Sequence, residues 1–278
     1  MNQQLPMSSV SFIHCCVQKT ASQWFFALYS DPRFQSLTGL NVLSFTDYVE
    51  LCQGLPNWQR DPEFYRAAYE YLPFSAPFPG RTIGCPFYIG YRTYLEMTKK
   101  SELRALFVTR DPRDLMLSGY FSLRDSHPDM EVNSQMRSKL RTLNFADGLK
   151  HYLEYIIDLG LFEAQVDWHR AANKDTEGHI KLIRYEDLAD RYTEFFLELL
   201  RVFAPDCERE HSSSLMHRFS FQSQKTSSLF PKGHLRRGRS GEWSETFTPE
   251  FEEFFVSKTG NLVYDLGYSP DRETNKLA

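Results

Sequence analysis

The chain has 278 residues, of which 41% are hydrophobic and 24% charged, a composition that excludes disorder and fits one large domain or two small ones. A net charge of −4 argues against a general nucleic-acid binder. No run of about 18 apolar residues predicts a membrane span, and the amino-terminal residues do not resemble a signal peptide. We therefore expect a cytoplasmic protein with no membrane or nucleic-acid partner.

Three short apolar runs rich in β-forming residues are the predicted strands, namely Val10–Val17, Ala105–Thr109 and Ile180–Tyr185. A polar turn and then a helical pattern follow each of them. Strands that alternate with helices predict an α/β fold, in which helices cover both faces of a central parallel sheet. The predicted helices are Ser22–Tyr29, Pro112–Leu123, Phe145–Leu159, Phe162–Asn173, Leu188–Phe203 and Pro249–Lys258.

Other segments have weaker patterns. Leu72–Gly80 is rich in proline and predicts a loop. Ser126–Asn144 is polar and predicts either a mobile cover over a site or an ordinary surface excursion. The residues from about 270 to 278 predict a flexible tail, and we expect residues 1–278 to form a single domain. The five cysteines include no Cys-x-x-Cys pair and predict neither a disulfide framework nor a metal site.

The first segment that could carry chemistry follows the first predicted strand. A strand–turn–helix junction presents free backbone N–H groups and the positive end of a helix dipole. Lys19 and the hydroxyl groups of Thr20 and Ser22 add further donors at the same place. This combination predicts a site for a phosphate-like anion, and a plain turn with an exposed lysine is the alternative.

The second segment follows the second predicted strand. Asp111 is a suitable N-cap and Pro112 suits the first position of a helix, so Arg110 should end the strand at the carboxyl edge of the sheet. Ligands of open α/β sheets bind at that edge. Ser118 lies about two turns further along the predicted helix. Alternatively, Arg110 only pairs with a nearby carboxylate.

Two more segments complete the pattern. Tyr185, at the end of the third strand and before two acidic residues, could cover a base or a ribose, or it could be an ordinary aromatic residue. The later stretch around Arg236, Arg237 and Gly238 is strongly cationic in an otherwise acidic chain. Arginine side chains are well suited to phosphate oxygens, although a solvated loop or a contact for an acidic partner is the alternative.

Together these four segments resemble the PAPS-dependent sulfotransferase family, whose donor is 3′-phosphoadenosine 5′-phosphosulfate. The family's first loop, Pro-Lys-Ser-Gly-Thr-Thr-Trp, is similar to residues 18–24, which read Gln-Lys-Thr-Ala-Ser-Gln-Trp. The resemblance implies that Lys19 contacts the oxygen that bridges sulfate and phosphate, and that Trp24 lies near the adenine. It implies that the 5′-phosphosulfate is held by Lys19, Thr20, Ala21, Ser22 and Gln23.

The rest of the family's donor site also has counterparts. The family grips the 3′-phosphate with an arginine and a serine eight positions later, a spacing that Arg110 and Ser118 reproduce. Tyr185 matches the tyrosine of a Tyr-Glu-Asp motif, and Phe221 matches an aromatic residue that covers the adenine. Residues 236–238 resemble the family's Arg-Lys-Gly loop, so Arg236, Arg237 and Gly238 should close over the 3′-phosphate.

The resemblance implies a P-loop-like sulfotransferase fold and a definite reaction. The enzyme would move a sulfuryl group from PAPS to a hydroxyl or amine of a small molecule, and it would release adenosine 3′,5′-bisphosphate (PAP) without needing a metal. A homodimer is one arrangement it allows. Two alternatives stay open, namely a non-catalytic nucleotide-binding protein on the same fold and a P-loop nucleotide kinase, although the latter would need a glycine-rich loop.

The sequence departs from the family in the first loop and at the general base. Glutamine and alanine occupy positions 18 and 21, where the family has proline and glycine. Many members carry a catalytic histidine upstream of the 3′-phosphate motif, but residues 80–94 contain none. His127, His151 and Glu70 are therefore the candidates for a base, and for each of them a surface role is the alternative.

Overall fold

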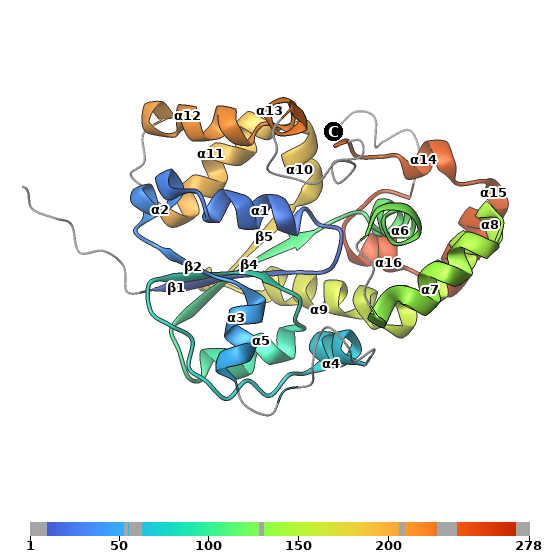
Figure 1. Cartoon of the computed structure of the whole chain (residues 1–278), viewed down its shortest axis with the longest axis horizontal. Helices are drawn as coiled ribbons and strands as arrows, with labels where there is room; N and C mark the ends of the chain where they lie inside the picture. The colour runs from blue at the N-terminus through green and yellow to red at the C-terminus, as the bar shows by residue number, and fades with distance from the viewer. Residues whose placement is uncertain are drawn as a thin grey trace, which may run out of the picture.

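The computed structural model describes residues 10–52, 55, 63–127, 131–205, 209–226 and 238–270. Within these residues, parallel strands form a five-stranded sheet of order β2-β3-β1-β4-β5 (Figure 1). The strands are β1 (Ser11–Cys16), β2 (Asn41–Leu43), β3 (Thr82–Phe87), β4 (Leu103–Thr109) and β5 (Ile180–Arg184). The central parallel sheet predicted from the sequence is thus confirmed.

Helices cover both faces of the sheet (Figure 1). One face carries α1 (Ser22–Tyr29), α2 (Pro32–Thr38), α10 (Tyr185–Asp190), α11 (Tyr192–Phe203), α12 (Arg209–Phe219) and α13 (Phe221–Thr226). The other carries α3 (Phe45–Leu51), α4 (Phe64–Glu70), α5 (Tyr91–Thr98) and α9 (Leu161–Lys174). At the right of the sheet in Figure 1 lie α6 (Pro112–Phe121), the π-helical turn η1 (Ser122–Ser126), α7 (Glu131–Thr142), α8 (Phe145–Asp158), α14 (Trp243–Thr246), α15 (Pro249–Thr259) and α16 (Leu262–Asp265).

The alternation of side chains along the strands divides the core into two layers. In β4, Ala105 and Phe107 pack with the helices of the α5–α9 face, whereas Leu106 and Val108 pack with α1 and α11. Successive residues of a strand point to opposite faces, so a strand buried on both sides reads as one apolar run. This is why the sequence of β4 indicates a central strand without any alternation of polar residues.

The structure corrects three expectations about the elements. The sheet includes β2 and β3, which the sequence did not predict. Residues 188–203 are not one helix, because α10 ends at Asp190 and α11 begins at Tyr192. The polar segment at 126–144, for which no helix was predicted, contains α7, which packs against α8. The proline-rich segment at 72–80 is a loop, as predicted.

No helix in the described part of the chain is long and apolar enough to cross a membrane.

Candidate functional site

The strand register brings the predicted segments to one edge of the sheet. It aligns the strand ends by pairing Cys15 with Phe87, Cys16 with Val108, and Thr109 with Arg184. Residues 18–22, which we call the Lys19 loop, follow β1, while Arg110 follows β4 and Tyr185 follows β5. Because parallel strands end at the same edge, the three segments meet at the carboxyl edge of the sheet.

The Lys19 loop has an unusual backbone. Lys19 and Ala21 adopt φ values of 71° and 62°, a left-handed conformation that residues other than glycine rarely adopt. Ala21 is the N-cap of α1, and its side chain caps no N–H group of the helix. The first N–H groups of a helix have no acceptor within the helix. This backbone conformation is compatible with backbone donors turned toward an anion.

The hydroxyl groups of this loop are already engaged. The Thr20 hydroxyl donates to the carbonyl of Val17 at 2.8 Å, which closes the turn. The Ser22 hydroxyl lies 2.8 Å from the hydroxyl of Tyr88. Thr20 therefore stabilises the shape of the loop, and its hydroxyl does not extend the donor set as the sequence suggested.

Arg110 joins the two predicted anion-binding segments. Its side chain is buried, and Nη1 donates a hydrogen bond to the carbonyl of Lys19 at 2.9 Å. The guanidinium lies 4.0 Å from the centre of the Tyr185 ring, a cation–π distance. Nε of Arg110 meets no hydrogen-bond partner among the described residues. A buried donor without a partner is costly, so this nitrogen suits an acceptor oxygen from a ligand.

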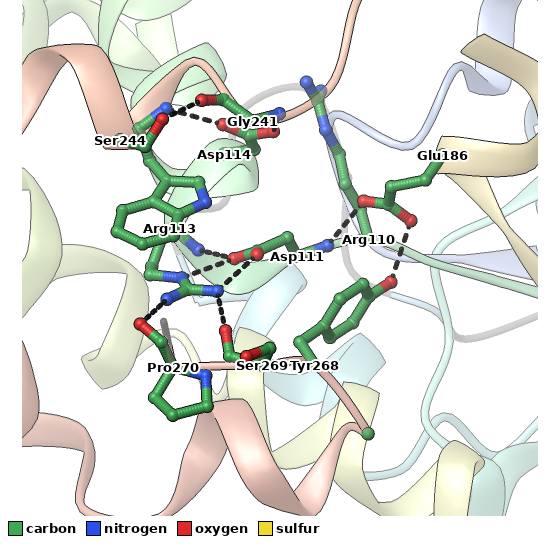
Figure 2. Close-up of polar contacts among 12 residues, drawn as sticks. Arg110, Asp111, Arg113, Asp114, Glu186, Gly241, Ser244, Tyr268, Ser269 and Pro270 are labelled. Carbon is green, nitrogen blue, oxygen red and sulfur yellow. Dashed lines mark hydrogen bonds and ion pairs between the residues drawn. The ribbon is translucent and has the colours of Figure 1, made fainter. Parts of the chain in front are cut away.

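The backbone of Arg110 is fixed on both sides. The Gln165 side chain donates to the carbonyl of Arg110 at 3.0 Å and accepts from its N–H at 3.4 Å. The N–H of the next residue, Asp111, donates to Glu186 at 2.9 Å, and the hydroxyl of Tyr268 donates to the other oxygen of Glu186 at 3.0 Å (Figure 2). The tail beyond α16 thus supports the end of β4.

Arg113, two residues inside α6, has a structural role. It forms a buried ion pair with Asp111 at 2.7 Å and donates to the carbonyls of Ser269 and Pro270 at 2.6 and 3.2 Å (Figure 2). Its guanidinium also lies 3.5 Å from the centre of the Trp243 ring. In Figure 2 the side chain of Arg110 points away from this pair, so only Arg110 is directed toward the Lys19 loop.

Asp114 anchors the segment that follows the cationic loop. Its carboxylate accepts hydrogen bonds from the N–H groups of Gly241 and Trp243, at 2.6 and 2.9 Å. Burial raises the pKa of Asp114 above its ordinary value, although Arg110 and these two N–H groups partly oppose the increase. Asp114, in the first turn of α6, therefore links this helix to α14.

Trp24 and Phe221, two aromatic residues of the predicted adenine site, differ in burial. Trp24 is buried in the core, where its indole N–H donates to the carbonyl of Phe219 at 2.9 Å. Phe221, two residues later, is exposed and packs on Gly238, since a Cβ atom at that glycine would lie 2.1 Å from its ring. Trp24 thus positions the segment that carries Phe221. Arg236 and Arg237 lie outside the described residues.

Comparison with known proteins decides the family. A family model described as a sulfotransferase domain matches residues 89–267. The chain belongs to the sulfotransferase family. A 3-alpha-hydroxysteroid sulfotransferase of Cavia porcellus is 22% identical over 224 residues, which cover 74% of this chain and 71% of that protein. The predictions of a sulfotransferase and a transferase enzyme are confirmed.

Solved structures share the fold of this sulfotransferase. A mouse sulfotransferase complexed with PAP has a TM-score of 0.59 at 16% identity and covers 93% of this chain and 86% of its own. A retinol dehydratase in a complex with retinol and PAP has a TM-score of 0.51 at 14% identity, and the match covers 96% of this chain and 84% of that chain. These matches confirm the predicted P-loop-like sulfotransferase fold.

The candidate bases lie on separate elements of the structure. Glu70, at the end of α4, is exposed, and His127 and His151 are partly buried. His14, by contrast, is buried in β1 beside the hydroxyl of Tyr29, and burial lowers its pKa to about 3.

Ser118, which the sequence assigns to the 3′-phosphate, lies two turns into α6 and is partly exposed. The described residues include no cluster of three or more His, Cys, Asp or Glu that could hold a metal ion.

Two tyrosines that the sequence analysis did not single out contact the Lys19 loop. Besides the bond from Tyr88 to Ser22, the hydroxyl of Tyr69 accepts a hydrogen bond from the N–H of Gln18 at 3.3 Å. Tyr88 follows β3, which the sequence did not predict, and Tyr69 lies in α4. No signal short of the sheet order could have placed them here.

A cavity of about 750 Å³ lies elsewhere in the sulfotransferase. It is lined by residues at the starts of β4 and β5, among them Leu103 and Ile180, and by residues of α5 and α9. The starts of parallel strands lie at the edge opposite the Lys19 loop. This cavity is therefore not the site formed by Lys19 and Arg110.

Proposed function

We propose that this sulfotransferase uses Lys19 and Arg110 to hold PAPS and transfers its sulfuryl group to a hydroxyl or amine of a small molecule, releasing PAP. The observation that carries the proposal is the hydrogen bond from Arg110 to the carbonyl of Lys19. It joins the residue expected at the bridging oxygen to the residue expected at the 3′-phosphate. Two structures with the same fold were solved with PAP, which supports the choice of ligand.

The residues present fit such a donor. The buried Nε of Arg110 has no partner in the described structure, and it can donate to a phosphate oxygen in a charge-assisted bond. Ser118, with Arg236, Arg237 and Gly238, would complete the hold on the 3′-phosphate. The N–H groups at the start of α1 would face the 5′-phosphosulfate, with Tyr185 and Phe221 on the adenine side.

Lys19 is the residue we assign to the chemistry. When bound, PAPS supplies an activated sulfuryl group, and negative charge grows on the oxygen that leaves the sulfur. A fixed ammonium at that oxygen stabilises the transition state more than the ground state. The structure holds the carbonyl of Lys19 through Arg110, which fixes the point from which this side chain extends.

A small apolar alcohol is the acceptor class that the comparisons favour. A sequence relative is named for a hydroxysteroid, and neighbours of the same fold were solved with retinol or androsterone. A requirement for no metal, a single domain over residues 1–278, a homodimer and a cytoplasmic location remain predictions alongside this proposal.

Turnover of radiolabelled PAPS with a panel of phenols, alcohols and amines tests the proposal. We expect label to reach at least one acceptor, and EDTA to leave the rate unchanged. Tight PAP binding without transfer to any acceptor would instead favour the non-catalytic alternative, which the absence of a histidine at residues 80–94 supports. Loss of activity in EDTA would contradict transfer without a metal.

A further inference from the structure

The order of the strands places different residues on the two flanks of the Lys19 loop. β1, which precedes the loop, lies between β3 and β4. Arg110 and Tyr185 follow β4 and β5, so the proposed nucleotide site lies on that flank. Tyr88 follows β3 directly and therefore lies on the opposite flank, at the same edge of the sheet.

The reaction geometry assigns these flanks different roles. In an in-line transfer, the acceptor oxygen and the leaving oxygen lie on opposite sides of the sulfur atom. If the nucleotide is held on the flank of β4 and β5, the acceptor approaches from the flank of β3. Side chains that reach the Lys19 loop from β3 are therefore the ones that an acceptor meets.

Tyr88 reaches the loop from this flank with a polar group. Its hydroxyl lies 2.8 Å from that of Ser22, the first residue of α1. A phenol can donate one hydrogen bond and also accept one. The contact with Ser22 uses one of these capacities and leaves the other for a second hydroxyl group.

Two further aromatic side chains lie beside Tyr88 or the Lys19 loop. The ring of Tyr65 lies 6.3 Å from the Tyr88 ring, and Tyr69 contacts the same loop through its hydroxyl. Residues 80–94 contain no histidine, and Tyr88 within them bonds to the Lys19 loop through its hydroxyl.

We propose that the hydroxyl of Tyr88 binds the hydroxyl group of the acceptor and, through Ser22, aligns it with the Lys19 loop. This proposal rests on the proposed function. Burial raises the pKa of Tyr88 well above its ordinary value, so the phenol stays neutral at working pH. Tyr88 therefore orients the acceptor by hydrogen bonding and does not act as a base.

The test compares Tyr88→Phe with Tyr94→Phe, whose hydroxyl donates to Leu103 at the opposite edge of the sheet. Turnover of labelled PAPS is measured with 4-nitrophenol, with benzyl alcohol or, where neither reacts, with water as the acceptor. We expect kcat/KM for the organic acceptor, or kcat where water is the acceptor, to fall about 10–100-fold in Tyr88→Phe only. Affinity for PAP, measured by calorimetry, should change by less than about threefold, a range below one ordinary hydrogen bond.

Two further measurements distinguish a role of Tyr88 in orienting the acceptor from a role in stabilising the fold. Because Tyr88 does not titrate, Tyr88→Phe should keep the shape of the wild-type pH–rate profile. Because Tyr88 and Ser22 act through one bond, adding Ser22→Ala should cost less in Tyr88→Phe than in the wild type. Equal losses in Tyr88→Phe and Tyr94→Phe, additive losses, or a missing limb of the pH profile would overturn the proposal. Failure of the wild type to bind PAP would instead overturn the proposed function.

Discussion

Lys19 and Arg110 are separated by 91 residues, and the carbonyl of one accepts a hydrogen bond from the guanidinium of the other. The sequence indicated each of them from its own strand–helix junction. The bond between them could not be predicted, because it depends on β1 and β4 being neighbours in the sheet. Because Arg110 binds the main-chain carbonyl of Lys19, substituting the Lys19 side chain leaves this acceptor in place, and the two side chains can be tested separately.

Lys19→Ala should act mainly on the chemical step. The charge that Lys19 is assigned to stabilise develops in the transition state, so we expect kcat to fall about 10²–10³-fold. The affinity for PAP should change by less than about tenfold. Lys19→Arg should recover part of the rate, since a guanidinium is planar and larger than an ammonium. Steady-state kinetics with labelled PAPS measure these values, and wild-type turnover in Lys19→Ala would exclude the assigned role.

Arg110→Ala should act mainly on donor binding. A charge-assisted contact with a phosphate contributes about 1.5–3 kcal/mol, so the KM for PAPS should rise about tenfold to a hundredfold. Arg110→Lys keeps the charge but loses the fork that reaches both Lys19 and a ligand, and should recover little of the affinity. A collapsed kcat at an unchanged KM would show that Arg110 serves the chemical step instead.

At the scale of elements, α6 connects the donor edge to the carboxyl-terminal segments. Asp111, Arg113 and Asp114 all lie in its first turn or at its cap, and they bind the tail and the segment before α14 (Figure 2). The N-cap role of Asp111 was predicted correctly, and its side chain accepts from the N–H of Arg113 at 2.9 Å. The contacts to residues more than a hundred positions away were beyond local sequence rules.

Asp114→Ala should destabilise the fold. It removes the acceptor for the N–H groups of Gly241 and Trp243, and unpaired buried donors cost about 1–3 kcal/mol each. Asp114→Asn retains one acceptor oxygen and should lose about half as much. Urea denaturation followed by circular dichroism gives the free energy of unfolding. Equal stability of Asp114→Ala and the wild type would contradict the anchoring role.

Glu186 should make stability depend on pH. Burial raises its pKa to about 7, so the folded state holds this proton more tightly than the unfolded state, where the pKa is about 4.3. The contribution of Glu186 to stability therefore falls as the pH rises from about 4.3 to about 7. The glutamine of Glu186→Gln does not ionise. The free energy of unfolding of this variant should therefore exceed that of the wild type by about 1–3 kcal/mol between about pH 5 and pH 8. Parallel pH profiles of unfolding would contradict the shifted pKa.

Particular elements explain which parts of the fold the sequence could predict. The strands β1, β4 and β5 could be predicted because each is a short apolar run rich in β-forming residues. β2 has only three residues, and β3 contains Gly84 and Pro86, which are uncommon in strands. The break between α10 and α11 at Arg191 has neither glycine nor proline to indicate it. Each of these features depends on tertiary packing.

At the scale of the whole molecule, the acidic chain concentrates its proposed anion-binding groups at one edge of one sheet. Of the predicted donor residues, Lys19, Arg110 and Tyr185 contact one another there, whereas Tyr88 and Tyr69 contact the Lys19 loop from elements that the sequence did not reveal. The residues of the proposed donor site could therefore be named from the sequence, whereas those of the proposed acceptor side could not. Motifs for phosphate binding lie within short segments, but an acceptor surface is assembled from distant ones.

Thermal unfolding with PAP and with AMP tests the central claim most directly, because the two ligands differ in the 3′-phosphate that Arg110 is proposed to hold. A hundredfold excess over Kd adds about 2.7 kcal/mol of stability, so PAP should raise the Tm by about 5 °C. AMP should raise it much less, and Arg110→Ala should remove most of the difference between them. Equal shifts from PAP and AMP in the wild type would contradict the 3′-phosphate site.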